Sequence, residues 1–347
     1  MIFEHSDKTK ALIERLENFM DKHVYPAEAI YAEQMAAFGE NRWQVPQIVE
    51  DLKVKAKEAG LWNLFLPESE EGAGLTNVEY APLCEVMGRV GFASEVFNCA
   101  APDTGNMEVL ERYCNEEQKE RWLKPLLNGD IRSAFAMTEP DVASSDATNI
   151  QTAIRRDGDH YVVNGKKWFI TNAPYERTKI LIVMGKSDPD NSNRHLQQSQ
   201  ILVPKDTPGV TVVRPLTTLG YDDAPLGHAE VHFDNVRVPV ANRIGEENKG
   251  WTYAKFLLTH ERTGIAGVAR SKKGLARLKE IAKAEYIDGR PLFEDQDFSR
   301  KIAELEIDLT ALEYTDLRVL SELRKGNHPG PESSILKIKG TEIQQLL

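Results

Sequence analysis

Glu261 is an acidic residue in a segment whose apolar residues recur at helical spacing. Leu258 precedes it by three positions and Ile265 follows it by four, and residues at these spacings share one face of a helix. Burial on such a face raises the pKa of a carboxyl group towards the range that is useful for proton transfer. We therefore expect Glu261 to act as a general base. A salt bridge to an arginine of a neighbouring helix is the alternative.

Two segments of similar composition could bind a flat ring. Residues 135–140 (FAMTEP) and 168–172 (WFITN) both combine apolar side chains with a threonine hydroxyl. Apolar atoms can cover the faces of a conjugated ring, and polar groups can bind its rim. The alternative is that Phe135, Trp168 and Phe169 belong to the core of a β domain.

Common metal and nucleotide motifs are missing from the sequence. It contains no GxGxxG after a predicted strand, no GxxxxGK[ST], no HExxH and no GxSxG. His228 and His232 fall on one face of a predicted strand, but they have no third ligand, so no metal site is expected. Lys166 and Lys167 are expected on a solvated hairpin edge and not in a nucleic-acid patch.

Charge and cysteine content limit the class of protein. A net charge of −11 argues against binding to nucleic acid or to an anionic membrane. The three cysteines lack CxxC spacing, which is typical of a reduced, intracellular protein. Apolar runs are too short for a signal core or a membrane span. We expect a cytoplasmic protein without a membrane span.

Hydrophobic periodicity divides the chain into three parts and predicts an α+β fold. The pattern is helical up to about residue 130, and Ser6 or Asp7 can cap the first helix. Residues 131–241 contain short apolar strands, and the dipeptide at 164–165 (Asn-Gly) predicts a two-residue hairpin turn.

The last part returns to helical periodicity. Long helices are expected over residues 250–285 and 298–325, and Ser333 can cap a third helix. That helix still runs at Leu347 without a stop signal. The chain therefore looks cut short at its C-terminus.

Four segments resemble the acyl-CoA dehydrogenase family, flavoenzymes that desaturate acyl thioesters at the α and β carbons. They are AMTEP, NGKKWFITN, FDNVRVP and HERTGIA. The resemblance implies an acyl-CoA dehydrogenase-like fold with an N-terminal α-helical domain (1–130), a middle antiparallel β domain (131–241) and a C-terminal helical bundle (242–347). One or two helices of that bundle are expected to be missing.

The resemblance implies FAD as the cofactor, held by the two ring-binding segments and the loop between them. Ser144 and Ser145 are alternatives for one position close to the ring. The implied cofactor-binding residues are Phe135, Met137, Thr138, Ser144, Ser145, Trp168, Phe169, Ile170 and Thr171. The implied substrate-binding residues are Arg262, Ser145 and Asp103. For the segment that carries Asp103, ordinary helix packing is the alternative.

The resemblance also implies a reaction. Glu261 is expected to remove the α-proton of an acyl-CoA while the β-hydrogen leaves as hydride to N5 of FAD, which gives the trans-2-enoyl-CoA. Arg262 is expected beside it in the active site. The other position that the family uses for a base lies beyond Leu347.

Members of this family take part in fatty acid β-oxidation and are mostly homotetramers or dimers. We expect a homodimer or homotetramer that passes electrons to an electron-transfer flavoprotein. Two alternatives stay open: an acyl-CoA oxidase, which reoxidises its flavin with oxygen, and a catalytically silent acyl-CoA-binding subunit.

Overall fold

A computed structural model describes residues 5–66, 69, 71–261, 266–324 and 332–347, without the side chains of 258–261, 323–324 and 332–333. The chain forms two compact units, which are described separately. The sheet unit comprises Ala29–Lys57 and Asn98–Leu258. The bundle unit comprises Met1–Glu28, Glu58–Phe97 and Thr259–Leu347.

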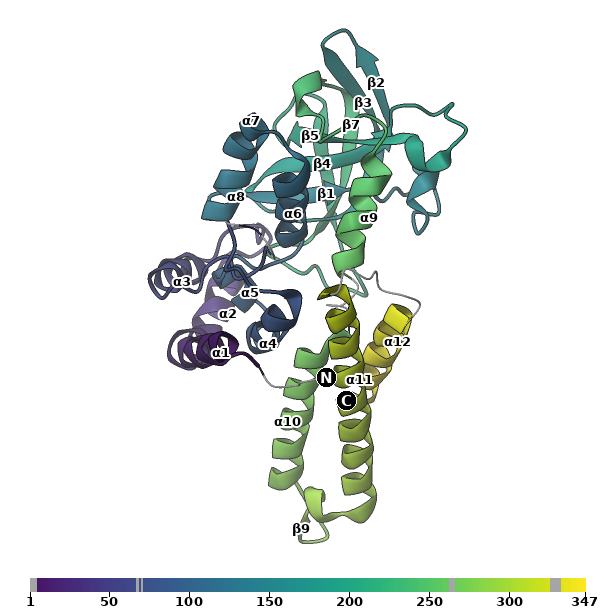
Figure 1. Ribbon diagram of the computed structural model, residues 1–347. Helices are drawn as coiled ribbons and strands as arrows, with labels where there is room; N and C mark the ends of the chain where they lie inside the picture. Colours follow the sequence, from purple (N-terminus) through teal and green to yellow (C-terminus); the bar gives the residue numbers. More distant parts are fainter. Residues whose placement is uncertain (1–4, 67–68, 70, 262–265, 325–331) are drawn as a thin grey trace. The chain divides into compact units, whose positions relative to one another are not determined.

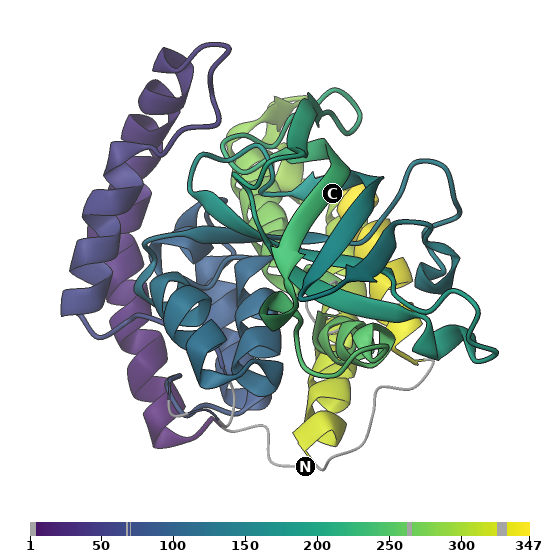
Figure 2. The same cartoon turned by 90° about the horizontal axis from the view of Figure 1, so that it is seen from above.

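Within the described residues, seven strands form the large sheet of the sheet unit (Figure 1). Their order is β1-β4-β2-β3-β7-β6, with β5 paired to β4, and the strands twist against one another (Figure 2). Most pairs are antiparallel, but β1 and β2 both run parallel to β4, so the predicted antiparallel domain also contains parallel pairing. The strands are β1 (Arg132–Ala136), β2 (Ala153–Asp157), β3 (His160–Thr171), β4 (Thr178–Lys186), β5 (Gln198–Pro204), β6 (Val210–Leu216) and β7 (His228–Pro239).

The interior position of β4 explains its composition. The strand lies between β1 and β5, and its residues from Ile180 to Met184 are all buried. A strand that is covered on both faces needs apolar side chains at every position. The continuous apolar run in the sequence is consistent with this arrangement.

The sheet unit also contains helices, of which α6 contacts β1. Asn115 begins the pair of short helices α7 and α8 with a capping box to Gln118. The helices, with bounds that extend in places into the bundle unit, are α2 (Glu28–Ala37), α3 (Gln47–Glu58), α6 (Asp103–Tyr113), α7 (Glu116–Gln118), α8 (Lys124–Asn128) and α9 (Gly250–Glu261).

The bundle unit is helical. Ser6 caps its first helix by accepting a hydrogen bond from the Thr9 backbone N–H, as predicted. The core of the last three helices is formed by leucine, isoleucine, alanine and valine side chains. The elements are α1 (Asp7–Phe19), α4 (Asn77–Met87), α5 (Ala93–Val96), α10 (Val268–Ala284), a small hairpin of β8 (Tyr286–Ile287) and β9 (Arg290–Pro291), α11 (Gln296–Arg324) and α12 (Glu332–Leu346).

The hairpin predicted at residues 164–165 is wrong. β3 runs through Asn164 and Gly165 without turning, and the turn to β2 lies at Gly158 instead. Gly165 is needed for close packing, because a Cβ atom there would lie 2.3 Å from Thr152 Oγ1. The Asn-Gly signal therefore reports a tight contact between chain segments and not a turn.

The single helix predicted over 250–285 is also wrong. α9 ends at Glu261, and α10 begins at Val268 after Gly267, whose φ is +61°. Such a left-handed backbone cannot continue an α-helix. α12 packs closely here, since a Cβ on its Gly340 would lie 2.3 Å from the Ala266 carbonyl oxygen.

Candidate functional site

Two backbone segments that the sequence predicted as one site lie side by side in the sheet unit. The Trp168 backbone N–H donates to the Thr138 carbonyl at 3.0 Å, and the Thr138 hydroxyl donates to the Trp168 carbonyl at 2.6 Å. Thr138 follows β1, and Trp168 lies within β3. The structure thus brings together segments that are 30 residues apart.

A buried ion pair lies directly behind this junction. Lys167 Nζ lies 2.8 Å from Glu139 Oε1 and donates to the Met137 carbonyl at 2.7 Å. Lys167 is fully buried and Glu139 is 4% exposed. The solvated position predicted for Lys167 is therefore wrong, although its neighbour Lys166 is exposed. The pair fixes the segment after β1 to β3.

Backbone groups complete the surroundings of Glu139. Its carboxylate accepts hydrogen bonds from the N–H of Gln151 at 2.6 Å and of Thr152 at 2.9 Å. Burial alone raises the pKa of this carboxyl, but Lys167 and these hydrogen bonds outweigh burial and hold the pKa below its ordinary value. Glu139 is therefore a charged structural anchor.

The geometry gives the two candidate serines different roles. The Ser144 hydroxyl accepts from the Glu139 N–H at 2.8 Å and donates to the Glu139 carbonyl at 2.9 Å. Ser144 therefore closes its own loop. Ser145 is exposed and is the more accessible of the two.

The apolar residues of the two segments differ in how far they are buried. Phe135 and Met137 pack, like Trp251 of α9, against a small buried cluster that includes Ile150 and Met184. Ile170 is only 1% exposed and belongs to the main core of the sheet. Phe169, in contrast, is 42% exposed. The predicted ring-binding residues thus combine core packing with accessible surface.

A β-bulge sets the direction of Trp168 and Phe169. The register of β3 against β7 shifts between Lys167 and Ile170, and Phe169 has a φ of +50°. This conformation is rare for a bulky residue and is typical of functional positions. The two rings pack edge to face with centroids 5.1 Å apart, so they act as one aromatic group.

Thr171 at the end of β3 faces His228 at the start of β7. Its hydroxyl lies 3.0 Å from His228 Nδ1, and His228 Nε2 lies 3.2 Å from a carboxylate oxygen of Asp223. The sequence indicated Thr171 but gave no sign that His228, which pairs in turn with Asp223, lies beside it. His232, four residues further along, pairs with Glu230 instead. In the described part of the chain, no group of three or more His, Cys, Asp or Glu side chains could hold a metal ion.

Asp103 lies in a buried polar network. It is 1% exposed, and its Oδ1 accepts from both the N–H and the hydroxyl of Ser133 at 2.6 Å. Its Oδ2 accepts from Asn172 at 2.9 Å and lies 3.9 Å from Arg132 Nε. These contacts give Asp103 a structural role, and the sequence had left such a role open as the alternative for this segment. Contact with substrate stays a prediction.

The predicted base falls at the edge of the described residues. Glu261 is the last residue of α9, but the structure does not describe its side chain. Arg262 lies outside the described residues altogether. The roles of both residues remain predictions from sequence.

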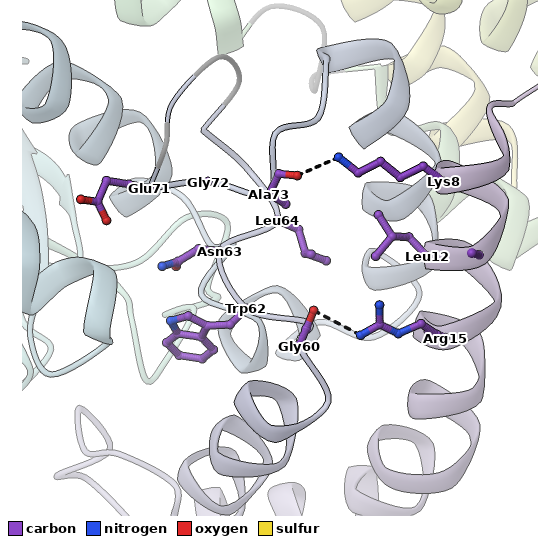
Figure 3. A pocket seen from close by; sticks show the side chains of 11 residues that line it. Lys8, Leu12, Arg15, Gly60, Trp62, Asn63, Leu64, Glu71, Gly72 and Ala73 are labelled. Carbon is purple, nitrogen blue, oxygen red and sulfur yellow. Dashed lines mark hydrogen bonds between the residues drawn. The ribbon is translucent and has the colours of Figure 1, made fainter.

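A cavity of about 530 Å³ is found in the bundle unit, between α1 and two segments, residues 60–64 and 71–73 (Figure 3). Lys8 of α1 points towards Ala73 and donates to its carbonyl at 3.0 Å, and Arg15 points towards Gly60. None of the residues predicted for catalysis, cofactor or substrate lines this cavity. It therefore has no part in the proposed site.

In the described ranges, no helix combines the length and the hydropathy needed to cross a bilayer.

Comparison with protein-family models gives three matches. The description "Acyl-CoA dehydrogenase, N-terminal domain" matches residues 6–130. "Acyl-CoA dehydrogenase, middle domain" matches residues 134–236, and "Acyl-CoA dehydrogenase, C-terminal domain" matches residues 248–347.

Similar proteins agree with these matches. "Probable acyl-CoA dehydrogenase FadE2" of Mycobacterium tuberculosis is 47% identical over 307 residues, which cover 88% of this chain and 74% of that protein. "Acyl-CoA dehydrogenase family member 10" of Mus musculus is 45% identical over 340 residues, 96% of this chain. The chain spans 31% of the length of that mouse protein and 42% of family member 11 of Gallus gallus.

A solved structure from Mycobacterium abscessus, assigned to the acyl-CoA dehydrogenases, has the same fold. It is 42% identical, with a TM-score of 0.94, and the match covers 99% of this chain and 87% of that chain. The order of a helical segment, a β segment and a second helical segment is therefore the acyl-CoA dehydrogenase-like fold. The chain belongs to the acyl-CoA dehydrogenase family.

Proposed function

We propose that this chain is an FAD-dependent acyl-CoA dehydrogenase that converts an acyl-CoA to the trans-2-enoyl-CoA. Family membership supports the reaction class. The observation that carries the proposal is the pair of hydrogen bonds between Thr138 and Trp168. They join the two segments that resemble the flavin-binding segments of the family.

The residues around this junction fit a flavin. The half-buried Thr138 and Thr171 hydroxyls lie near the partly exposed aromatic pair of Trp168 and Phe169. Such a set offers apolar atoms to the faces of a ring and polar atoms to its rim. The same fold holds FADH2 in a glutaryl-CoA dehydrogenase from Mycobacterium smegmatis, which is 23% identical with a TM-score of 0.77. That likeness concerns the fold alone.

In this proposal the chain supplies position and proton transfer. FAD, when bound, accepts the β-hydrogen of the acyl group as hydride. The Glu261 carboxylate takes the α-proton, and the electron pair of that C–H bond forms the new double bond as the hydride leaves. Hydrogen-bond donors at the thioester carbonyl make the α-proton acidic enough for this step. Ser145 and Arg262 are proposed to bind the acyl-CoA substrate.

The junction residues have a supporting role. Phe135, Met137, Thr138, Trp168, Phe169 and Thr171 are proposed to contact the flavin, with Ile170 holding the segment to the sheet core. The ion pair of Lys167 and Glu139 keeps these residues in place from behind. Ser144 is proposed to shape the loop.

An electron-transfer flavoprotein is the proposed acceptor of the electrons, and a homodimer or homotetramer is the proposed assembly. Both come from the resemblance to the family. The expected division at residues 130 and 241 and the cytoplasmic localisation also stay predictions. The measured mass in solution tests the assembly.

The test of the reaction is spectroscopic. The purified chain, reconstituted with FAD, is expected to be yellow and to lose its absorbance near the flavin maximum when acyl-CoA is added without oxygen. Electron-transfer flavoprotein should restore the colour, and air should restore it slowly. Rapid recovery in air identifies an oxidase. A yellow protein that no acyl-CoA bleaches identifies a silent binding subunit and overturns the proposal.

A further inference from the structure

We propose that His228 is a positioning residue that fixes the direction of the Thr171 hydroxyl at the flavin site. This inference rests on the proposed function. It starts from three groups in a row: the Thr171 hydroxyl, the His228 imidazole and the Asp223 carboxylate. The Thr171 hydroxyl lies 3.0 Å from His228 Nδ1, and His228 Nε2 lies 3.2 Å from the Asp223 carboxylate. All three lie in the sheet unit.

For the neutral imidazole, the chemistry of the row determines the hydrogen positions. An ionised carboxylate only accepts hydrogen bonds, so His228 Nε2 carries the hydrogen that points to Asp223. In the neutral imidazole the other nitrogen, Nδ1, then has no hydrogen and accepts. The Thr171 hydroxyl must therefore donate to Nδ1. The lone pairs of the Thr171 oxygen then remain available to a hydrogen-bond donor on the side away from His228.

The backbone around His228 holds the ring in place. Residues Thr171 and His228 are direct partners in the antiparallel pairing of β3 with β7. Gly227, just before His228, donates to the Asp223 carbonyl at 2.9 Å and accepts from the Asn172 N–H at 3.0 Å. Both hydrogen bonds fix the loop between Asp223 and His228. A flexible contact between two surface side chains would not need this support.

Gly227 also has a conformation that only glycine adopts easily. Its φ is +58°, and a Cβ atom would lie 2.3 Å from the Trp43 ring. The His228 ring faces the Phe169 ring with centroids 6.5 Å apart. His228 therefore contacts two residues of the second ring-binding segment, Phe169 and Thr171, without belonging to that segment.

His232 provides a matched control on the same strand. It lies on the same face of β7, and its Nε2 is 2.8 Å from the Glu230 carboxylate. Its partner on β3 is Lys166 and not a threonine. Both histidines thus pair with a carboxylate. The other ring nitrogen of His228 also lies within hydrogen-bond distance of Thr171, a predicted flavin-binding residue.

The test compares flavin binding in matched variants. FAD is titrated into the flavin-free chain, and the dissociation constant and absorbance maximum are measured for wild type, His228→Leu, Thr171→Val, the double variant and His232→Leu. Loss of one directed hydrogen bond corresponds to roughly three- to tenfold in affinity. We expect this weakening, with a shifted absorbance maximum, for each single variant at position 228 or 171. The double variant should be no weaker than either, and His232→Leu should stay within about twofold of wild type.

A conservative variant separates positioning from simple packing. The substitution His228→Asn removes the ring but keeps an acceptor, because the amide oxygen can accept from Thr171 as Nδ1 does. It should restore the wild-type spectrum and affinity within about twofold. A merely structural role would respond to any loss of the ring. Wild-type affinity and spectrum in His228→Leu, or multiplying effects in the double variant, would overturn the inference.

A second measurement does not depend on the flavin. Nitrogen-15 spectra of the histidine-labelled chain, recorded at alkaline pH where an imidazole is neutral, should show the hydrogen of His228 on Nε2, identified by the signal that His228→Asn removes. Hydrogen on Nδ1 of the neutral ring would overturn the inference. A wild-type chain that takes up no FAD overturns the proposed function, and this inference with it. Uptake of FAD without an effect of His228→Leu overturns only the inference.

Discussion

Lys167 and Glu139 form a fully enclosed ion pair whose Nζ and Oε1 atoms lie 2.8 Å apart. The two residues come from different segments of the proposed flavin site, and Lys167 also donates to the Met137 carbonyl at 2.7 Å. One side chain thus ties the segment after β1 to β3.

Lys167→Met should destabilise the chain strongly. The substitution leaves the Glu139 carboxylate buried without its counter-charge, which typically costs about 3–5 kcal/mol. Chemical denaturation measures the change, and the exposed neighbour Lys166 offers the control Lys166→Met, with an expected change below about 0.5 kcal/mol. Adding Glu139→Gln to Lys167→Met should recover part of the loss. Equal stability of the two lysine variants would contradict the structural role of the pair.

The cost of Lys167→Met should shrink in acid. The pKa of Glu139 is held below its ordinary value in the folded chain, so its stabilising contribution is present above the ordinary carboxyl range and is lost as the pH falls through the lowered pKa. Without Lys167, the carboxyl can instead be buried in its protonated form. Burial lowers the pKa of Lys167 to about 8, so the comparison is made at pH 4 and pH 6.5, where the lysine stays charged. The difference in stability between variant and wild type should be smaller at pH 4. A pH-independent difference would argue against a charged pair.

Asp316→Asn should stabilise the chain at neutral and alkaline pH. Burial, with Glu313 nearby, raises the pKa of Asp316 to about 7, and one carboxylate oxygen has no hydrogen-bond partner among the described residues. A raised pKa means that stability falls as the pH rises from the unfolded value of 3.8 towards 7. We expect a gain of roughly 2–3 kcal/mol at pH 8 and none at pH 4. The exposed residue of the same helix, Asp308, gives the control Asp308→Asn, and a matching gain there would contradict the explanation.

Asp103→Asn should destabilise the sheet unit by roughly 3 kcal/mol. Both carboxylate oxygens accept hydrogen bonds, from Ser133 and Asn172, and an amide can offer only one oxygen. One donor would then face the amide NH2 group. Thermal unfolding of this variant is compared with Asp141→Asn in an exposed loop. Two variants of equal stability would show that the network contributes little.

The sequence predicted the helical and β segments and the cap at Ser6, because these follow from local patterns. It also indicated the two segments around Thr138 and Trp168, but their direct hydrogen bonds depend on how β1 and β3 meet in space. Long-range packing explains why the predictions of a hairpin at 164–165 and of a single helix over 250–285 were wrong. Gly165 lies against Thr152, and Gly340 lies against Ala266, and neither contact can be read from neighbouring residues.

Buried polar groups were the least predictable part of the site. Two adjacent lysines at 166 and 167 look alike in the sequence, but one is exposed and the other fully buried. Asp103 and His228 carry no motif, and their partners lie between 5 and 69 residues away. Their roles depend on the tertiary structure.

The most direct test of the proposed reaction is the rate at which acyl-CoA bleaches the FAD of the wild-type chain and of Glu261→Gln, measured without oxygen by stopped flow. Loss of a general base costs about 10²- to 10⁴-fold. The variant should bind FAD and acyl-CoA as wild type does but lose its absorbance at least a hundredfold more slowly, whereas Glu294→Gln at an exposed position should match wild type. Bleaching of Glu261→Gln at the wild-type rate would contradict the assignment of Glu261 as the proton acceptor.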